Sequence, residues 1–170
     1  MALLVCAGYA SEAISWLDVP YVRQVKSGCG AAAVSMVVQY WARHNPELGS
    51  AADETDRINE LLPASGRGGI RGALLEDYLA QRGFAVYVFD GEAKDLRQHF
   101  SKGRPVIVCL GPAGPKGPLH YAVVVGIDDH LVWLHDSARG KLFRQDLNRF
   151  EASWAVSGHW ALLAVPRSAR

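Results

Sequence analysis

The chain has 170 residues, of which 49% are hydrophobic and 21% charged, and its formal net charge is +1. A chain of this length can bury a sizeable core without metals or disulfides, so we expect one compact domain. A net charge so close to zero gives no electrostatic case for binding nucleic acid. The three cysteines are too few for a disulfide framework.

Residues 1–16 form an N-terminal segment that we separate from a domain over 17–170. Residues 2–10 are apolar and end in small residues, as the end of a secretory signal does, but the basic start of such a signal is missing. The stretch is too short to span a bilayer. Two interpretations stay open, a signal remnant or a packed terminus. The first slightly favours the cell envelope or secretion over the cytoplasm.

Hydrophobic periodicity and turn residues place the elements of the domain. Three helices are expected in the first half, at 29–45, 51–62 and 70–82. A glycine-rich loop is expected at 66–69, and Gly83 is expected to end the third helix. Strands are expected at 84–89, 106–110, 120–127, 131–136 and 159–165, with short helices at 93–101 and 146–154. Helices that precede an antiparallel sheet predict an α+β fold.

Cys29 stands at the start of the first helix, in the run Gln24-Val25-Lys26-Ser27-Gly28-Cys29-Gly30. Unpaired backbone N–H groups and the helix dipole stabilise a thiolate at such a position, so the thiol pKa is expected to fall below its free value. Gly28 and Gly30 are expected to let the chain turn sharply and expose the sulfur. The other interpretation is a buried structural thiol, a common place for free cysteine.

His120 and Asp136 bracket a predicted hairpin. His120 opens the strand at 120–127, and Asp136 closes the strand at 131–136, after a turn at 128–130. In an antiparallel hairpin, the start of one strand lies beside the end of the next. We therefore expect the two side chains to be neighbours, as a base and its orienting carboxylate. The residues also fit a strand-edge histidine bonded to a carbonyl, and an aspartate that begins a turn.

These residues resemble those of the C39 peptidases, papain-like cysteine proteases best known as N-terminal domains of bacteriocin-exporting ABC transporters. The resemblance runs through Gln-x4-Cys-Gly at 24–30, the His-Tyr pair at 120 and Asp136, and it covers about Leu17 to Pro166. It implies a papain-like fold, with N-terminal helices packed on a C-terminal antiparallel sheet.

The resemblance also implies roles for four residues. Cys29 would be the nucleophile, His120 the general base and then the general acid, and Asp136 the residue that fixes the imidazole. Gln24 would donate its side-chain amide to the oxyanion, alongside the backbone N–H of Cys29. The implied reaction is hydrolysis of a peptide or small protein without a metal or cofactor. The family's association with double-glycine leader peptides suggests cleavage after small residues.

Two departures from the family limit what can be transferred. Many exporter-linked members have an acidic residue before the nucleophile, where this chain has Gly28. The 170 residues also contain neither a Gly-x4-Gly-Lys-Ser/Thr loop nor a stretch long enough to span a bilayer. An ABC exporter is therefore expected only as a separate partner. The segment at 111–117 is expected to be a loop that shapes the substrate cleft.

Three alternatives stay open at this point. One is a module that binds peptides in the same cleft without cutting them. Another is a different papain-like acyl transfer, such as amidase or transglutaminase chemistry, which uses the same residues. The third is a zinc hydrolase with Cys29, His120 and Asp136 as ligands, although the other histidines lack a second ligand at metal spacing.

Overall fold

The computed structural model describes residues 16–25, 27–48, 54–61, 70–112 and 117–167. In chain order its elements are α1 (Cys29–His44), η1 (Pro46–Leu48), α2 (Glu54–Leu61), α3 (Gly72–Gln81), β1 (Phe84–Asp90), α4 (Ala93–Ser101), β2 (Val106–Leu110), β3 (His120–Ile127), β4 (Leu131–Asp136), β5 (Gly140–Asp146), α5 (Leu147–Ala155) and β6 (Trp160–Pro166).

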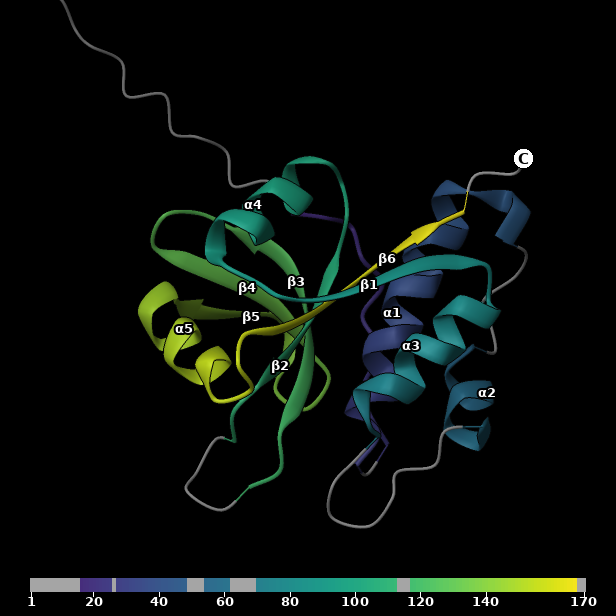
Figure 1. The fold of residues 1–170 in the computed structure, drawn as a ribbon, viewed down its shortest axis with the longest axis horizontal. Coiled ribbons are helices and arrows are strands. Elements are labelled where there is room, and N and C mark those ends of the chain that lie inside the picture. Colours follow the sequence, from purple (N-terminus) through teal and green to yellow (C-terminus); the bar gives the residue numbers. More distant parts are fainter. Residues whose placement is uncertain (1–15, 26, 49–53, 62–69, 113–116, 168–170) are drawn as a thin grey trace, which may run out of the picture.

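The strands form a six-stranded sheet in the order β1-β6-β2-β3-β4-β5, and every neighbouring pair is antiparallel. Helices α1, α2 and α3 gather at one side of the molecule, and α4 and α5 lie at the other (Figure 1). The predicted α+β class, with N-terminal helices packed on an antiparallel sheet, is confirmed. The helices at 29–45, 93–101 and 146–154 are also confirmed, within one or two residues.

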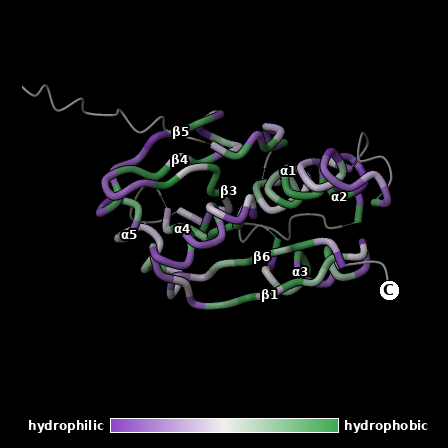
Figure 2. The backbone as a smooth tube through the Cα atoms, turned by 90° about the horizontal axis from the view of Figure 1, so that it is seen from above, coloured by the Kyte–Doolittle hydropathy of each residue, from purple (hydrophilic) through white to green (hydrophobic). Residues whose placement is uncertain are grey.

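Side chains along the central strands alternate between two hydrophobic cores. Ile107 of β2 packs in the core beneath α1 and α3, whereas Val106 and Val108 pack in the core with Leu96 of α4 and Trp154 of α5. Because both faces are covered, every residue of β2 is buried. Hydrophobic stretches in α1 and β4 stand out as green tube (Figure 2). Hydrophobic cores therefore cover both faces of the sheet beside β3 and β4, the strands that carry His120 and Asp136.

The prediction missed one strand. We expected only a turn after Asp136, but residues 140–146 form β5, which pairs with β4 at the edge of the sheet. Its sequence, GKLFRQD, is mostly polar, and none of its residues is fully buried. An edge strand that buries so little carries a weak hydrophobic signal, because its pairing with β4 depends mainly on backbone hydrogen bonds.

Gly83 follows α3 with a φ of +88°, so the predicted helix end is confirmed, since glycine adopts this left-handed conformation without strain. Other expectations fall outside the described residues: the segment 1–15, the first residues of the helix at 51–62, the loop at 66–69, and the centre of the loop at 111–117. No helix of the described part of the chain is long and apolar enough to cross a membrane.

Candidate active site

Cys29 is the first residue of α1, so its backbone N–H points out of the helix start. The sulfur is not exposed as expected, because only 7% of the residue is accessible to solvent. The glycines on either side of Cys29 let neighbouring groups lie close to the backbone, and neither adopts a left-handed conformation. A Cβ on Gly30 would lie 3.2 Å from Leu75 and 3.3 Å from the ring of Tyr121, and one on Gly28 would lie 2.9 Å from the Val25 carbonyl oxygen.

Asp136 is the last residue of β4, and it lies beside the start of the neighbouring strand β3. The register pairs Val123 with His135, so it places Asp136 near His120. His120 Nε2 lies 2.8 Å from Asp136 Oδ1, and the carboxylate is completely buried, whereas the His120 side chain is 20% exposed. The expected neighbour relationship therefore exists, and it leaves Nδ1 of the imidazole for a second partner.

Asp136 Oδ1 also organises the turn that follows it. It accepts the backbone N–H groups of Ala138 at 2.9 Å and Arg139 at 3.0 Å, while Arg139 Nε lies 3.6 Å from Oδ2. Burial alone would raise the pKa of Asp136. The hydrogen bond from His120, its charge and the two N–H groups outweigh burial and hold the pKa of this carboxyl below its usual value. The group is therefore ionised at neutral pH.

Cys29 and His120 form a coupled pair. Burial would raise the pKa of the Cys29 thiol, but a hydrogen bond to His120, the N–H groups of Tyr121 and Gly30, and the charge on His120 lower it overall. Burial would likewise lower the pKa of His120, yet bonds to Asp136 and Cys29 raise it to about 9. Opposite shifts on the two partners favour a thiolate beside an imidazolium at neutral pH.

Gln24 lies in the extended segment before α1, and Ser137 binds it twice. The backbone N–H of Gln24 donates to the Ser137 carbonyl at 3.2 Å, and the Ser137 hydroxyl donates to Gln24 Oε1 at 3.0 Å. The hydroxyl of Tyr21 donates to the Asp136 carbonyl at 3.2 Å. Gln24 is thus fixed to the turn that begins directly after Asp136.

Sequence reasoning assigned no role to three residues near the site, although Tyr121 belongs to the His-Tyr pair noted above. Tyr121 supplies an N–H to Cys29, and its ring packs edge-on against Trp160 with centroids 5.5 Å apart. Ser137 holds Gln24. The only sequence signal for Tyr121 and Ser137 is that they follow His120 and Asp136, and nothing in the local pattern marks Trp160.

The remaining thiol and histidine of this region are structural. Cys109 is buried in β2, as expected, and burial raises the pKa of its thiol to about 11. His135, which the sequence reasoning did not discuss, donates from Nε2 to the Val19 carbonyl and accepts the Leu142 N–H at Nδ1. Among the described residues, no group of three or more His, Cys, Asp or Glu side chains is arranged to hold a metal ion.

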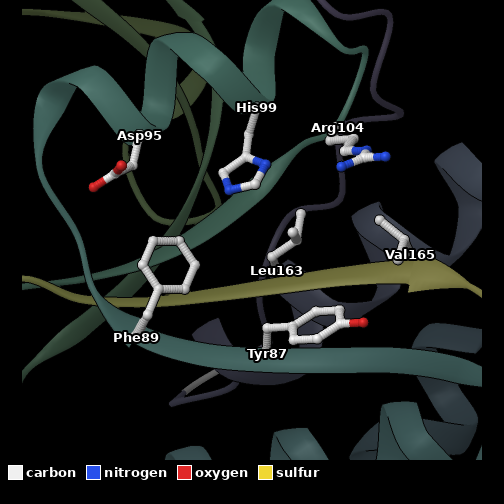
Figure 3. Close-up of a pocket in the computed structure, with 7 residues that line it drawn as sticks. All are labelled: Tyr87, Phe89, Asp95, His99, Arg104, Leu163 and Val165. Carbon is white, nitrogen blue, oxygen red and sulfur yellow. The ribbon is translucent and has the colours of Figure 1, made fainter.

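A pocket of about 470 Å³ lies elsewhere on the molecule, between β1, β6 and α4 (Figure 3). Its lining residues are Tyr87, Phe89, Asp95, His99, Arg104, Leu163 and Val165. Leu163 belongs to the core beneath α4 and α5, whereas α1 packs on the other face of the sheet. None of the residues that line the pocket is one of the four candidate site residues.

Solved structures of known proteins share this fold. A Bacillus anthracis protein described as a C39-like peptidase superposes with a TM-score of 0.70 at 17% identity, covering 91% of this chain and all of that one. A double glycine motif protease from an AMS/PCAT transporter, solved with a leader peptide, gives 0.68 at 19% identity, covering 89% of this chain and 94% of that one. The peptidase domain of Streptococcus ComA, a bifunctional ABC transporter of a quorum-sensing pathway, gives 0.65 at 22% identity, covering 86% and 98%.

These identities are low, so the superpositions establish the papain-like peptidase fold rather than a shared substrate. No curated protein matches the sequence. The model of one family, described as the Peptidase_C39 like family, matches residues 16–162, which is most of the chain and includes all four candidate site residues. The chain therefore belongs to the Peptidase_C39 like family.

Proposed function

We propose that the chain is a cysteine peptidase that hydrolyses peptide bonds through Cys29, His120 and Asp136, with Gln24 as an oxyanion donor. One observation carries the proposal: a buried carboxylate bonds at 2.8 Å the imidazole of His120, and that imidazole lowers the pKa of a thiol at a helix start. This arrangement supplies a nucleophile, a proton carrier and its orienting group in hydrogen-bond contact.

In the acylation step, the Cys29 thiolate attacks the carbonyl carbon of the scissile peptide bond. The tetrahedral intermediate collapses when the C–N bond breaks, and the His120 imidazolium gives its proton to the leaving amine. The product is a thioester between Cys29 and the N-terminal part of the substrate. Asp136 stays ionised throughout and keeps the imidazole in position.

In the deacylation step, the now neutral His120 takes a proton from water as the water oxygen attacks the thioester carbon. The C–S bond then breaks, the product leaves as a carboxylic acid that gives its remaining proton to the solvent, and the thiolate–imidazolium pair is restored. Both steps place negative charge on the former carbonyl oxygen. The Cys29 N–H at the start of α1 and the Gln24 amide would stabilise that charge, and one such donor contributes about 3 kcal/mol.

The substrate that we propose is a peptide in extended conformation with small residues before the scissile bond. Two observations support it: only 7% of Cys29 is accessible, which favours residues without bulky side chains beside it, and one structural neighbour is a double glycine motif protease. A separate ABC exporter is the partner that we propose from the same neighbours. Processing of bacteriocin-type leaders is the corresponding biological role.

The test is mass spectrometry of a set of precursor peptides, in which a leader ending in Gly-Gly is followed by further residues, incubated with the parent protein and with its Cys29→Ala and Cys109→Ser variants. We expect cleavage after the second glycine by the parent and by Cys109→Ser, and none by Cys29→Ala. Full activity in Cys29→Ala would refute the proposal. Binding without cleavage would identify a peptide-binding module, and transfer of the acyl group to an added amine in preference to water would identify a transferase.

A further inference from the structure

We propose that Ser137 is a positioning residue that holds the Gln24 side chain where its amide nitrogen can serve the oxyanion. The inference rests on the proposed function, because the oxyanion exists only if the chain transfers acyl groups. Ser137 itself would not touch the substrate. It would act through Gln24 alone.

The first support is that Ser137 forms hydrogen bonds with both the backbone and the side chain of Gln24. Its carbonyl accepts the Gln24 backbone N–H at 3.2 Å, and its hydroxyl donates to Gln24 Oε1 at 3.0 Å. The two residues are 113 positions apart in the chain. One backbone and one side-chain bond between the same pair fix both the place of the residue and the direction of its long side chain.

The second support is burial. Ser137 is completely inaccessible to solvent, although it begins the turn between β4 and β5. A buried hydroxyl keeps its partner because it cannot bond to water instead. With Oε1 held by Ser137, the Nε2 end of the planar amide faces away from Ser137. Donors aimed in advance stabilise a developing charge without reorganisation during the reaction.

The third support is the position of Ser137 next to Asp136. The Asp136 carboxylate bonds His120, and the next residue bonds Gln24. A single turn therefore fixes both the proton carrier and the oxyanion donor relative to the sheet. Because the two roles come from different residues, a change at Ser137 should disturb the oxyanion donor and leave the Cys29–His120 pair intact.

The experiment compares Ser137→Ala, Ser137→Thr, Gln24→Ala and the double variant Ser137→Ala/Gln24→Ala, with a precursor peptide whose Gly-Gly leader is followed by further residues as substrate. We expect Ser137→Ala to lower kcat about 5- to 30-fold with little change in KM, since small displacements of a catalytic group can cost up to about 10²-fold. Ser137→Thr should recover most of the rate. The double variant should be no slower than Gln24→Ala, because the hydroxyl then has nothing to position.

Two readouts separate positioning from a structural role. The pH profile of Cys29 alkylation should be unchanged in Ser137→Ala, and the NMR order parameter of the Gln24 side-chain amide should fall. Ser35→Ala is the matched control, because Ser35 is equally buried but bonds Thr55 instead. We expect this control to keep the parent kcat and Gln24 order parameter.

Three results would overturn the inference. The first is an unchanged kcat in Ser137→Ala. The second is a double variant whose loss of kcat is the product of the two single losses, and the third is a shifted pH profile of Cys29 alkylation in Ser137→Ala. If Ser137→Ala does not fold, Ser137→Cys, which keeps a weaker donor, replaces it, and an unchanged kcat and order parameter there would count against the inference. If the parent cleaves nothing, the proposed function fails. The order parameter then shows separately whether Ser137 holds the Gln24 amide.

Discussion

His120 Nε2 lies 2.8 Å from Oδ1 of Asp136, whose carboxylate is completely buried. This contact leaves only one nitrogen of the imidazole, Nδ1, to meet the thiol of Cys29. The carboxylate also contributes to the raised pKa of His120, about 9. The proton that the leaving amine needs is therefore held on His120 at neutral pH.

Replacing Asp136 by Asn removes this charge and should lower the pKa of His120. In the parent, kcat/KM should fall as pH rises through about 9, because the deprotonated imidazole can no longer act as the general acid. In Asp136→Asn that fall should begin at least about one pH unit lower, which corresponds to about 1.4 kcal/mol of lost interaction. The pH dependence of kcat/KM for both proteins measures the shift, and identical alkaline limbs would contradict the prediction.

Iodoacetamide should label Cys29 rapidly well below pH 8, because the pKa of its thiol is lowered by His120 and two backbone N–H groups. The measurement uses Cys6→Ser/Cys109→Ser protein, so that Cys29 is the only thiol. Adding His120→Ala should slow labelling at neutral pH and move its profile toward that of an ordinary thiol. A profile that does not respond to His120→Ala would show that the pair is not activated.

Gln24→Ala should reduce the rate of the chemical step rather than substrate binding. We expect kcat to fall about 10²- to 10³-fold, the loss that follows removal of one oxyanion donor, with KM nearly unchanged. Steady-state kinetics with the precursor peptide that the parent cleaves separates the effect on kcat from the effect on KM. A rise in KM at constant kcat would instead identify Gln24 as a substrate-binding residue.

Glu54→Ala should destabilise the helical side of the molecule without touching the site. Glu54 is 3% exposed, accepts the Tyr78 hydroxyl at 2.6 Å and binds Arg82 through both carboxylate oxygens at 3.0 Å. Removing one partner of a buried ion pair costs about 3–5 kcal/mol, and the low end is expected because Arg82 is 20% exposed.

Urea unfolding measures this loss, with Glu60→Ala as the control on the same helix. Glu60 is exposed, so its replacement should change the free energy of unfolding by less than about 0.5 kcal/mol. The neutral-pH alkylation rate of Cys29 should be the same in both variants. Equal stabilities of Glu54→Ala and Glu60→Ala would show that the buried network contributes nothing net.

The sequence by itself determined the features that depend on neighbouring residues. Apolar side chains at 34, 37, 38 and 41 indicated a helix that starts at Cys29, and two short apolar runs around a turn indicated the hairpin that brings His120 beside Asp136. Both follow from local periodicity, because one period of a helix or strand spans only a few residues. The four roles at the site were drawn from family resemblance, and they stay predictions.

Only the tertiary structure decided the features that depend on residues far apart. Strand β6 inserts between β1 and β2, β5 adds an edge to the sheet, and Ser137 bonds Gln24 across 113 positions. The burial of Cys29 belongs here too, because Leu75 and Tyr121, which lie against the neighbouring Gly30, come from α3 and β3. No local pattern encodes such contacts, because their free energy comes from surfaces that meet only once the helices and the sheet have packed together.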